Sequence, residues 1–131
     1  MMKNIRVLVV DDNAEVRADL QMILGLIDGL VVIGDASNAG DAFNTASLTK
    51  PDLMIIDLEM GGPIGTEMDG CKVIRQVKSL RPAPVVFVLT VHGYDTAREE
   101  AFRAGADAFF EKGIEIKDLL NAVKNLLTRS R

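Results

Sequence analysis

The segment IRVLVVDD, residues 5–12, joins a valine-rich apolar run to two consecutive aspartates. A short run that contains Arg6 and stops at Asp11 is typical of a buried strand. The run is too short for a signal peptide or a membrane-spanning helix. Similar apolar runs, most of them rich in valine or isoleucine, occur at residues 30–33, 53–56, 85–89 and 108–110. The sequence therefore predicts five buried strands.

Amphipathic stretches lie between and after these apolar runs. Apolar residues recur at helical spacing in residues 16–27 and 116–127, so we expect two helices that each bury one face. Weaker stretches with alanine-rich faces occupy residues 39–47, 70–80 and 96–104. Strict alternation of strand and helix implies a parallel sheet with right-handed crossovers and helices on both faces. The predicted fold class is therefore α/β, with a doubly wound five-stranded parallel sheet.

Length and composition limit the function further. The chain has 131 residues, of which 48% are hydrophobic, so residues 1–131 are expected to form a single domain. We expect its core at about residues 5–127 and the start of a linker after Leu127. The single cysteine, Cys71, excludes an intrachain disulfide and a cysteine-based metal cage, which suits the cytoplasm. The formal net charge of -4 argues against direct nucleic-acid binding, and no segment predicts a membrane contact.

Polar residues follow the predicted strands at their carboxyl ends. In chain order they are Asp11, Asp12, Asp57, Thr90 and Lys112. Ligands of doubly wound sheets bind beyond the carboxyl ends of the strands. We therefore expect these five side chains to converge on one rim of the sheet.

Three carboxylates on one rim need a compensating charge. If they approach within about 5 Å, each pair repels by roughly 3 kcal/mol at an effective dielectric of about 20. A cation or bound protons must offset this repulsion. Oxygen ligands without histidine or cysteine favour a hard divalent ion, and a site that also bridges a phosphate favours Mg²⁺, for which Mn²⁺ can substitute. Asp12 or Asn13 also suits the N-cap of the following helix.

The same residues suit phosphoryl transfer to an aspartate. Asp57 is the candidate nucleophile, a metal would offset the charge on the phosphoryl oxygens, and Lys112 with Thr90 would hold the other oxygens. The expected product is an acyl phosphate, which hydrolyses readily. Such a product fits a reversible signal better than a permanent modification.

At these residues the chain resembles the response-regulator receiver domain of two-component signal transduction, from Ile5 to about Leu127. The motifs that carry the resemblance are Asp11 with Asp12, Asp57 within residues 54–60, Met68-Asp69-Gly70, Leu89-Thr90, Gly105-Ala106-Asp107 and Lys112. Each motif is weak alone, but their order and spacing are highly specific. The resemblance implies a flavodoxin-like (βα)5 receiver fold with strand order 2-1-3-4-5.

The resemblance also implies a role for each rim residue. Asp57 would accept a phosphoryl group from a histidine kinase or a phosphotransfer protein. The metal ligands would be Asp11, Asp12, Asp57 and the backbone carbonyl of Glu59, and Lys112 would contact the phosphoryl group. Such a domain is a phosphoacceptor and no enzyme, although it catalyses its own phosphorylation and dephosphorylation.

A conformational switch is implied as well. Thr90 would move toward the phosphoryl group, and Phe109 would turn inward into the space vacated. Phe110, on the opposite face of the same strand, is expected to pack in the core. The switched domain would control an output domain or a downstream protein, and the charged faces of the last two helices are candidates for output or homodimer contacts.

The chain departs from the family pattern near the pocket. Residues 61–67 contain an insertion of about five residues with several glycines, which would shield the acyl phosphate, contact a partner, or be a tolerated surface insertion. Gly113 stands where many members have proline, so the loop is expected to be more mobile. Val91 is bulkier than the usual residue beside Thr90, which predicts slow phosphoryl turnover.

Three other functions compete with this interpretation. A Mg²⁺-dependent aspartyl-phosphate phosphatase of the haloacid dehalogenase type has its nucleophile in an Asp-x-Asp motif, whereas Glu59 follows Leu58 here. A receiver-like interaction module that is never phosphorylated would not need the intact pocket. A flavin-binding domain of similar topology would place its phosphate beside Asp11 and Asp12, which would repel it.

Overall fold

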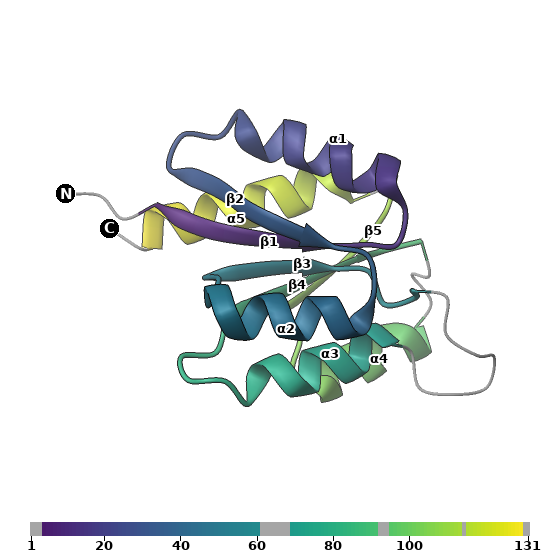
Figure 1. Cartoon of the computed structure of the whole chain (residues 1–131). Helices are drawn as coiled ribbons and strands as arrows, with labels where there is room; N and C mark the ends of the chain where they lie inside the picture. Colours follow the sequence, from purple (N-terminus) through teal and green to yellow (C-terminus); the bar gives the residue numbers. More distant parts are fainter. Residues whose placement is uncertain (1–3, 61–68, 92–94, 114, 130–131) are drawn as a thin grey trace.

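A computed structural model describes residues 4–60, 69–91, 95–113 and 115–129 of the chain. Strands and helices alternate throughout these residues (Figure 1). The strands are β1 (Ile5–Val10), β2 (Leu30–Ala36), β3 (Leu53–Ile56), β4 (Val85–Thr90) and β5 (Ala108–Glu111). The helices are α1 (Ala14–Gly25), α2 (Ala39–Thr49), α3 (Asp69–Lys78), α4 (Asp95–Ala104) and α5 (Ile116–Arg129). The predicted alternation is confirmed over the described residues.

All neighbouring strands of the five-stranded sheet run parallel, in the order β2-β1-β3-β4-β5. The predicted fold class and strand order are both confirmed. β1 lies between β2 and β3, so that Val10 is in register with Ala36 on one side and with Ile56 on the other. The carboxyl ends of the strands therefore lie together, at the right of Figure 1. The chain order switches direction between β1 and β3, where such sheets bind ligands.

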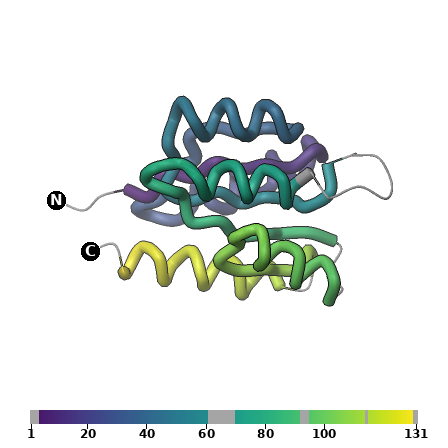
Figure 2. The backbone as a smooth tube through the Cα atoms, turned by 90° about the horizontal axis from the view of Figure 1, so that it is seen from below, coloured from purple at the N-terminus to yellow at the C-terminus, as the bar shows by residue number. Residues whose placement is uncertain are grey.

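Helices cover both faces of the sheet. α1 and α5 lie on one face, and α2, α3 and α4 lie on the other (Figures 1 and 2). Because successive side chains of a strand point to opposite faces, β1 contributes Val7 and Val9 to one buried cluster and Leu8 and Val10 to the other. None of the described helices is long and apolar enough to span a membrane. Strands buried on both faces explain the continuous apolar runs of the sequence.

Several element ends differ from the prediction by one to three residues, and two of these differences have a clear structural reason. β2 continues beyond residue 33 to Ala36, because this edge strand still pairs with β1 although it contains Gly34 and the exposed Asp35. α1 ends at Gly25, whereas its apolar stripe continues to Ile27. The amides of Leu26 and Ile27 donate to the carbonyl oxygens three residues earlier, at Ile23 and Leu24 within α1, so a tight turn continues the stripe beyond the helix.

Gly70, in the first turn of α3, packs directly against the segment that follows β3. Its amide donates to the Leu58 carbonyl oxygen at 2.9 Å. A Cβ atom added at Gly70 would lie 2.5 Å from the Leu58 Cα and 2.6 Å from the Asp57 carbonyl oxygen. Both are backbone atoms, so they cannot rotate away as a flexible side chain would. Only glycine allows α3 to approach the end of β3 this closely.

Gly70→Ala is therefore expected to lower the free energy of unfolding by about 1–3 kcal/mol, or more if the backbone cannot shift, because the added methyl group overpacks this contact. Urea unfolding measures the change. Gly25→Ala is the matched control, since a Cβ there meets nothing within 4 Å and alanine favours the helix by up to about 1 kcal/mol. Equal stabilities for the two variants would contradict the close approach described for Gly70.

Candidate functional site

The acidic pair follows β1 directly. The amide of Asp11 donates to the Ala36 carbonyl oxygen at 3.0 Å, so the backbone of this residue continues the pairing of β1 with β2. Its carboxylate is buried, and Oδ1 accepts the Asn13 amide at 2.9 Å. Asn13, rather than Asp12, caps α1, because its side chain accepts the Glu15 amide at 2.9 Å. Asp12 is left exposed at the rim.

Asp57 follows β3 at the neighbouring position of the rim. Its amide donates to the Val10 carbonyl oxygen at 2.9 Å, which fixes the end of β3 beside the end of β1. The residue is only 6% exposed. Its Oδ1 accepts the Glu59 amide at 3.2 Å, and its Oδ2 faces Lys112.

Lys112 joins the ends of three strands. Its Nζ donates to Asp11 Oδ2 at 2.6 Å and to Asp57 Oδ2 at 3.1 Å, although these residues are far apart in the chain. Its amide donates to the Thr90 carbonyl oxygen at 2.8 Å, so the end of β4 is held to the same segment. Thr90 is fully buried at this end of β4. The structure thus brings the predicted rim residues to one edge of the sheet.

The three carboxylates form a compact cluster. One oxygen atom from each of Asp11, Asp12 and Asp57 lies within 4.8 Å of the others. This separation agrees with the spacing assumed from the sequence, at which each charged pair repels by roughly 3 kcal/mol. The one ammonium of Lys112 leaves an excess of negative charge. Asp11 and Asp57 are buried, and Asp12 is exposed to solvent. Their carboxylate oxygens are ligands that fit a hard divalent cation, which could enter from solvent beside Asp12.

Burial changes the protonation of this cluster. Burial raises the pKa of the Asp57 carboxyl, the charge of Lys112 opposes the rise, and the Asp11 carboxylate adds to it. Burial alone would lower the pKa of Lys112, but its hydrogen bond to Asp11 and the charge of Asp57 raise that pKa overall. Lys112 is therefore the positive charge of the site, and burial disfavours the charged form of Asp57.

Phe109 lies on β5, three residues before Lys112. It is 4% exposed and belongs to the cluster beneath α2, α3 and α4, whereas Phe110 belongs to the cluster beneath α1 and α5. The expected core packing of Phe110 is confirmed, with its ring edge-to-face against Phe87 at 5.7 Å. The Arg98 guanidinium of α4 lies 4.8 Å from the Phe109 ring centroid. Phe109 is thus already buried, so a switch at this residue would start from an inward ring.

Arg17 is a residue of the site that the sequence did not reveal. From the second turn of α1, its Nη1 donates to the Asp11 carbonyl oxygen at 2.6 Å, and its Nε donates to Asp35 Oδ2 at 3.2 Å. Gln21 donates to the same Asp35 oxygen at 2.9 Å. Arg17 therefore fixes the backbone that carries the acidic pair. The available signal was a basic residue one helical turn after Asn13.

The remaining sequence predictions near the pocket have mixed outcomes. Residues 61–67, with the predicted overhang, lie outside the described residues. Val91 is 60% exposed beside the buried Thr90, so its side chain lies at the surface of the pocket region. Gly113 follows Lys112 with a φ of +79°, a conformation that a proline could not adopt. Glu59 is exposed, and the position of its carbonyl as a metal ligand stays a prediction.

Comparison with known proteins identifies related chains. The family profile described as the response regulator receiver domain matches residues 7–124. The transcriptional regulatory protein PdtaR of Mycobacterium tuberculosis (strain CDC 1551 / Oshkosh) is 36% identical over 126 residues, which are 96% of this chain and 58% of PdtaR. This chain therefore spans little more than half the length of that curated relative.

Two solved structures have the same fold. A two-component response regulator of the LuxR family from Aurantimonas sp. SI85-9A1 has a TM-score of 0.83 and 26% identity, covering 98% of this chain and 89% of that chain. The signal receiver domain of the putative response regulator NarL from Mycobacterium tuberculosis has a TM-score of 0.83 and 25% identity, covering 96% of this chain and 98% of that chain. The similarity thus extends over almost all of the chain.

The raised pKa of Asp57 predicts how stability depends on pH. The folded state binds the Asp57 proton more tightly than the unfolded chain does, so stability falls as pH rises from about the ordinary value of 3.8 through the raised pKa. In metal-free buffer, Asp57→Asn is expected to unfold at a higher urea concentration than wild type at neutral pH, and this advantage should disappear below the ordinary value. Asp118→Asn, at an exposed position, is the control. A neutral-pH loss of stability in Asp57→Asn would contradict the assignment.

Proposed function

Because the chain belongs to the response regulator receiver domain family of two-component signalling, we propose that Asp57 accepts a phosphoryl group in a reversible signalling reaction. The observation that carries the proposal is the rim itself. A buried carboxylate, Asp57, shares the Lys112 ammonium with Asp11 and lies in one oxygen cluster with Asp12. Receiver domains generally signal and do not act as enzymes, so the phosphorylated chain itself would carry the signal.

The reaction is a displacement at phosphorus. An Asp57 carboxylate oxygen forms the new bond to phosphorus, and the bond to the donor's leaving group breaks, so that an acyl phosphate and the free donor result. Lys112 supports this step because its Nζ already lies 3.1 Å from Asp57 Oδ2, where it would contact the phosphoryl oxygens. Thr90, buried at the end of β4, would hold a further oxygen. Lys112 and Thr90 would thus bind oxygens of the phosphoryl group that Asp57 accepts.

Mg²⁺ is the cation that the site fits, with Mn²⁺ as a substitute. When bound, it would supply positive charge against the phosphoryl oxygens. Asp11, Asp12 and Asp57 would hold it, together with the backbone carbonyl of Glu59. The excess negative charge of the cluster supports this assignment, because the Lys112 ammonium alone does not balance three carboxylates.

The conformational change would be transmitted from the site through β4 and β5. A phosphoryl group adds negative charge and acceptor oxygens beside Thr90, which can shift the hydrogen bonding of this loop. Phe109 and the overlying Arg98 link β5 to α4, so a change at the rim would reach the α4 surface. The donor would be a histidine kinase or a phosphotransfer protein in the cytoplasm, and an output domain or a downstream protein would read the change. PdtaR, a transcriptional regulator, is longer than this chain, which supports an output outside the matched region.

Incubation with Mg²⁺ and acetyl phosphate tests the function. Intact mass spectrometry is expected to show one added phosphoryl group on the wild type, stable in acid and lost in base. Asp57→Asn should gain none, and Asp118→Asn should react like wild type because its carboxylate is exposed and is not part of the carboxylate cluster. Chelation of Mg²⁺ should suppress the reaction.

Other outcomes would support the competing functions. No added mass on the wild type would favour an interaction module that is not phosphorylated. Continuous hydrolysis of a phosphate monoester such as p-nitrophenyl phosphate, in large excess over protein, would favour a phosphatase. An added phosphoryl group that persists in Asp57→Asn would place the acceptor elsewhere and contradict the role of Asp57.

Arg17 provides a separate test of the metal site. Arg17→Ala removes the hydrogen bond to the Asp11 carbonyl oxygen and is expected to weaken Mg²⁺ binding by about tenfold, because the acidic pair loses its backbone support. Isothermal titration calorimetry measures the affinity without any phosphoryl donor. Gln21→Ala is the matched control, because Gln21 contacts the same Asp35 oxygen but not Asp11. Equal affinities in both variants would show that Arg17 does not position the ligands.

A further inference from the structure

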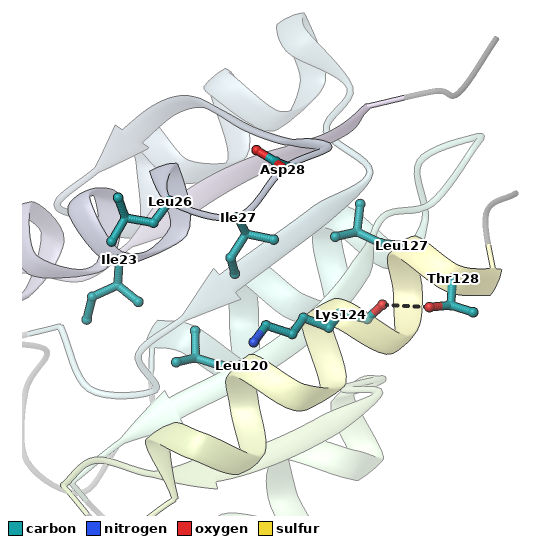
Figure 3. Close-up of a pocket in the computed structure, with 8 residues that line it drawn as sticks. All are labelled: Ile23, Leu26, Ile27, Asp28, Leu120, Lys124, Leu127 and Thr128. Atoms are coloured by element: carbon teal, nitrogen blue, oxygen red, sulfur yellow. Dashed lines mark hydrogen bonds between the residues drawn. The ribbon is translucent and has the colours of Figure 1, made fainter.

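A hollow between the end of α1 and the last turns of α5 contains none of the residues of the rim. Its volume is about 520 Å³, and Leu120 and Lys124 line it from α5 (Figure 3). None of its described lining residues ends a strand. The corner where α4, the end of β5 and the start of α5 meet is different, because it contains residues on both sides of Lys112 in the chain. This corner therefore leads directly to the site.

Reciprocal hydrogen bonds join the chain on either side of Lys112. The Glu115 amide donates to the Glu111 carbonyl oxygen at 2.9 Å, and the Glu111 amide donates to Glu115 Oε1, also at 2.9 Å. Glu111 ends β5, and Glu115 precedes α5, where the Leu119 amide donates to the Glu115 carbonyl oxygen at 3.0 Å. The segment that carries Lys112 is thus tied at both ends through the one Glu115 residue.

Gly113 gives this segment little rigidity of its own. A Cβ added at Gly113 would meet no described atom within 4 Å, so neighbouring side chains do not restrain this position. Glycine also has more backbone freedom than any other residue. The sequence accordingly predicts a mobile segment beside Lys112, and the hydrogen bonds of Glu115 oppose that mobility. The position of Glu115 therefore bears on the position of Lys112.

Arg98 of α4 contacts this segment on both sides of Lys112. Its Nη2 lies 3.9 Å from Glu115 Oε1, the same oxygen that accepts the Glu111 amide. Its guanidinium carbon lies 4.8 Å from the centroid of the buried Phe109 ring, within the range of a cation–π contact. An ion pair between partly exposed side chains contributes little alone. Here, however, one planar guanidinium makes both contacts at once.

We propose that Arg98 is a positioning residue for Lys112. From α4 its guanidinium holds Phe109, three residues before the lysine, and Glu115, three residues after it. The Lys112 ammonium is thereby kept between the two buried carboxylates, where it would meet the phosphoryl oxygens. This role deepens the proposed function and rests on it, because positioning Lys112 serves the reaction only if Asp57 accepts a phosphoryl group.

Arg103 lies on the same helix but lacks this arrangement. Its side chain is 79% exposed, and its described ion pair, at 4.0 Å, is with Glu99 of α4 itself. No described ring contact or ion pair joins it to β5 or α5. Arg103 is therefore the matched control for Arg98, since both are arginines of α4 that each face one glutamate.

Hydrogen exchange of the Glu111 amide, followed by NMR on the whole unphosphorylated chain, tests the restraint. Arg98→Ala is expected to speed this exchange by about threefold or more, because Glu115 loses the cation that holds its carboxylate near the amide. Arg98→Lys should exchange at an intermediate rate, since an ammonium keeps the charge but not the planar guanidinium. Arg103→Ala and Lys124→Ala should exchange like wild type. Thermal melting checks that each variant folds.

The rate of labelling by acetyl phosphate and Mg²⁺, followed by intact mass spectrometry, tests the effect on the reaction. Arg98→Ala is expected to slow labelling by about three- to tenfold, and Arg98→Lys should restore part of the rate. Glu115→Gln keeps an oxygen acceptor for the Glu111 amide but removes the charge that pairs with Arg98, so it should also slow labelling. The double variant should be no slower than the slower single variant, because the two residues act as one unit.

Three results would overturn the proposal while phosphorylation of Asp57 stands. Exchange of the Glu111 amide that is equal in Arg98→Ala and Arg103→Ala would show that Arg98 does not restrain the segment. Faster exchange with an unchanged labelling rate would show that the restraint does not position Lys112. Independent losses that add in the double variant would separate Arg98 from Glu115. A wild type that is never labelled would instead refute the proposed function, and with it any role of Arg98 in the reaction.

Discussion

The shared hydrogen bonding of Lys112 to Asp11 and Asp57 organises the molecule. Residues that end β1, β3 and β5 meet through one ammonium group, and the backbone of Lys112 adds the end of β4. The parallel sheet makes this meeting possible, because the carboxyl ends of its strands share one edge. The apolar runs that bury the strands therefore also place the charged groups. Core packing and site chemistry follow from the same pattern of residues.

The sequence predicted what periodicity and strand ends determine. β3 is a continuous apolar run and β1 is apolar except for Arg6, and the structure begins and ends both strands at the predicted residues. β2 was predicted too short because Gly34 and Asp35 break its apolar run, while the backbone pairing that continues it is independent of side chains. α1 was predicted too long because Ile27 continues its stripe, although the helical hydrogen bonds stop earlier.

The close grouping of Asp11, Asp12 and Asp57 was predicted, because the position of a residue after a strand is visible in the chain. The contact of Arg17 with the Asp11 carbonyl oxygen was not predicted. It joins a long side chain to a backbone atom, and the direction of that atom depends on the turn between the two residues. The buried state of Phe109 beneath Arg98 is likewise a tertiary property. Sequence order gives the edge of the sheet on which a residue lies, and packing decides the orientation of its side chain.

The placement of β1 between two partners has a thermodynamic consequence. Asp11 and Asp57 are each tied by their amides to a neighbouring strand, so neither can leave the rim without breaking sheet pairing. Local fraying there is coupled to the central pairing of the domain. A covalent group that favours this arrangement therefore stabilises the whole cooperative unit. A bound ion does the same by mass action, because it binds the folded state and not the unfolded chain. The occupancy of the rim and the melting temperature of the domain are thus linked quantities.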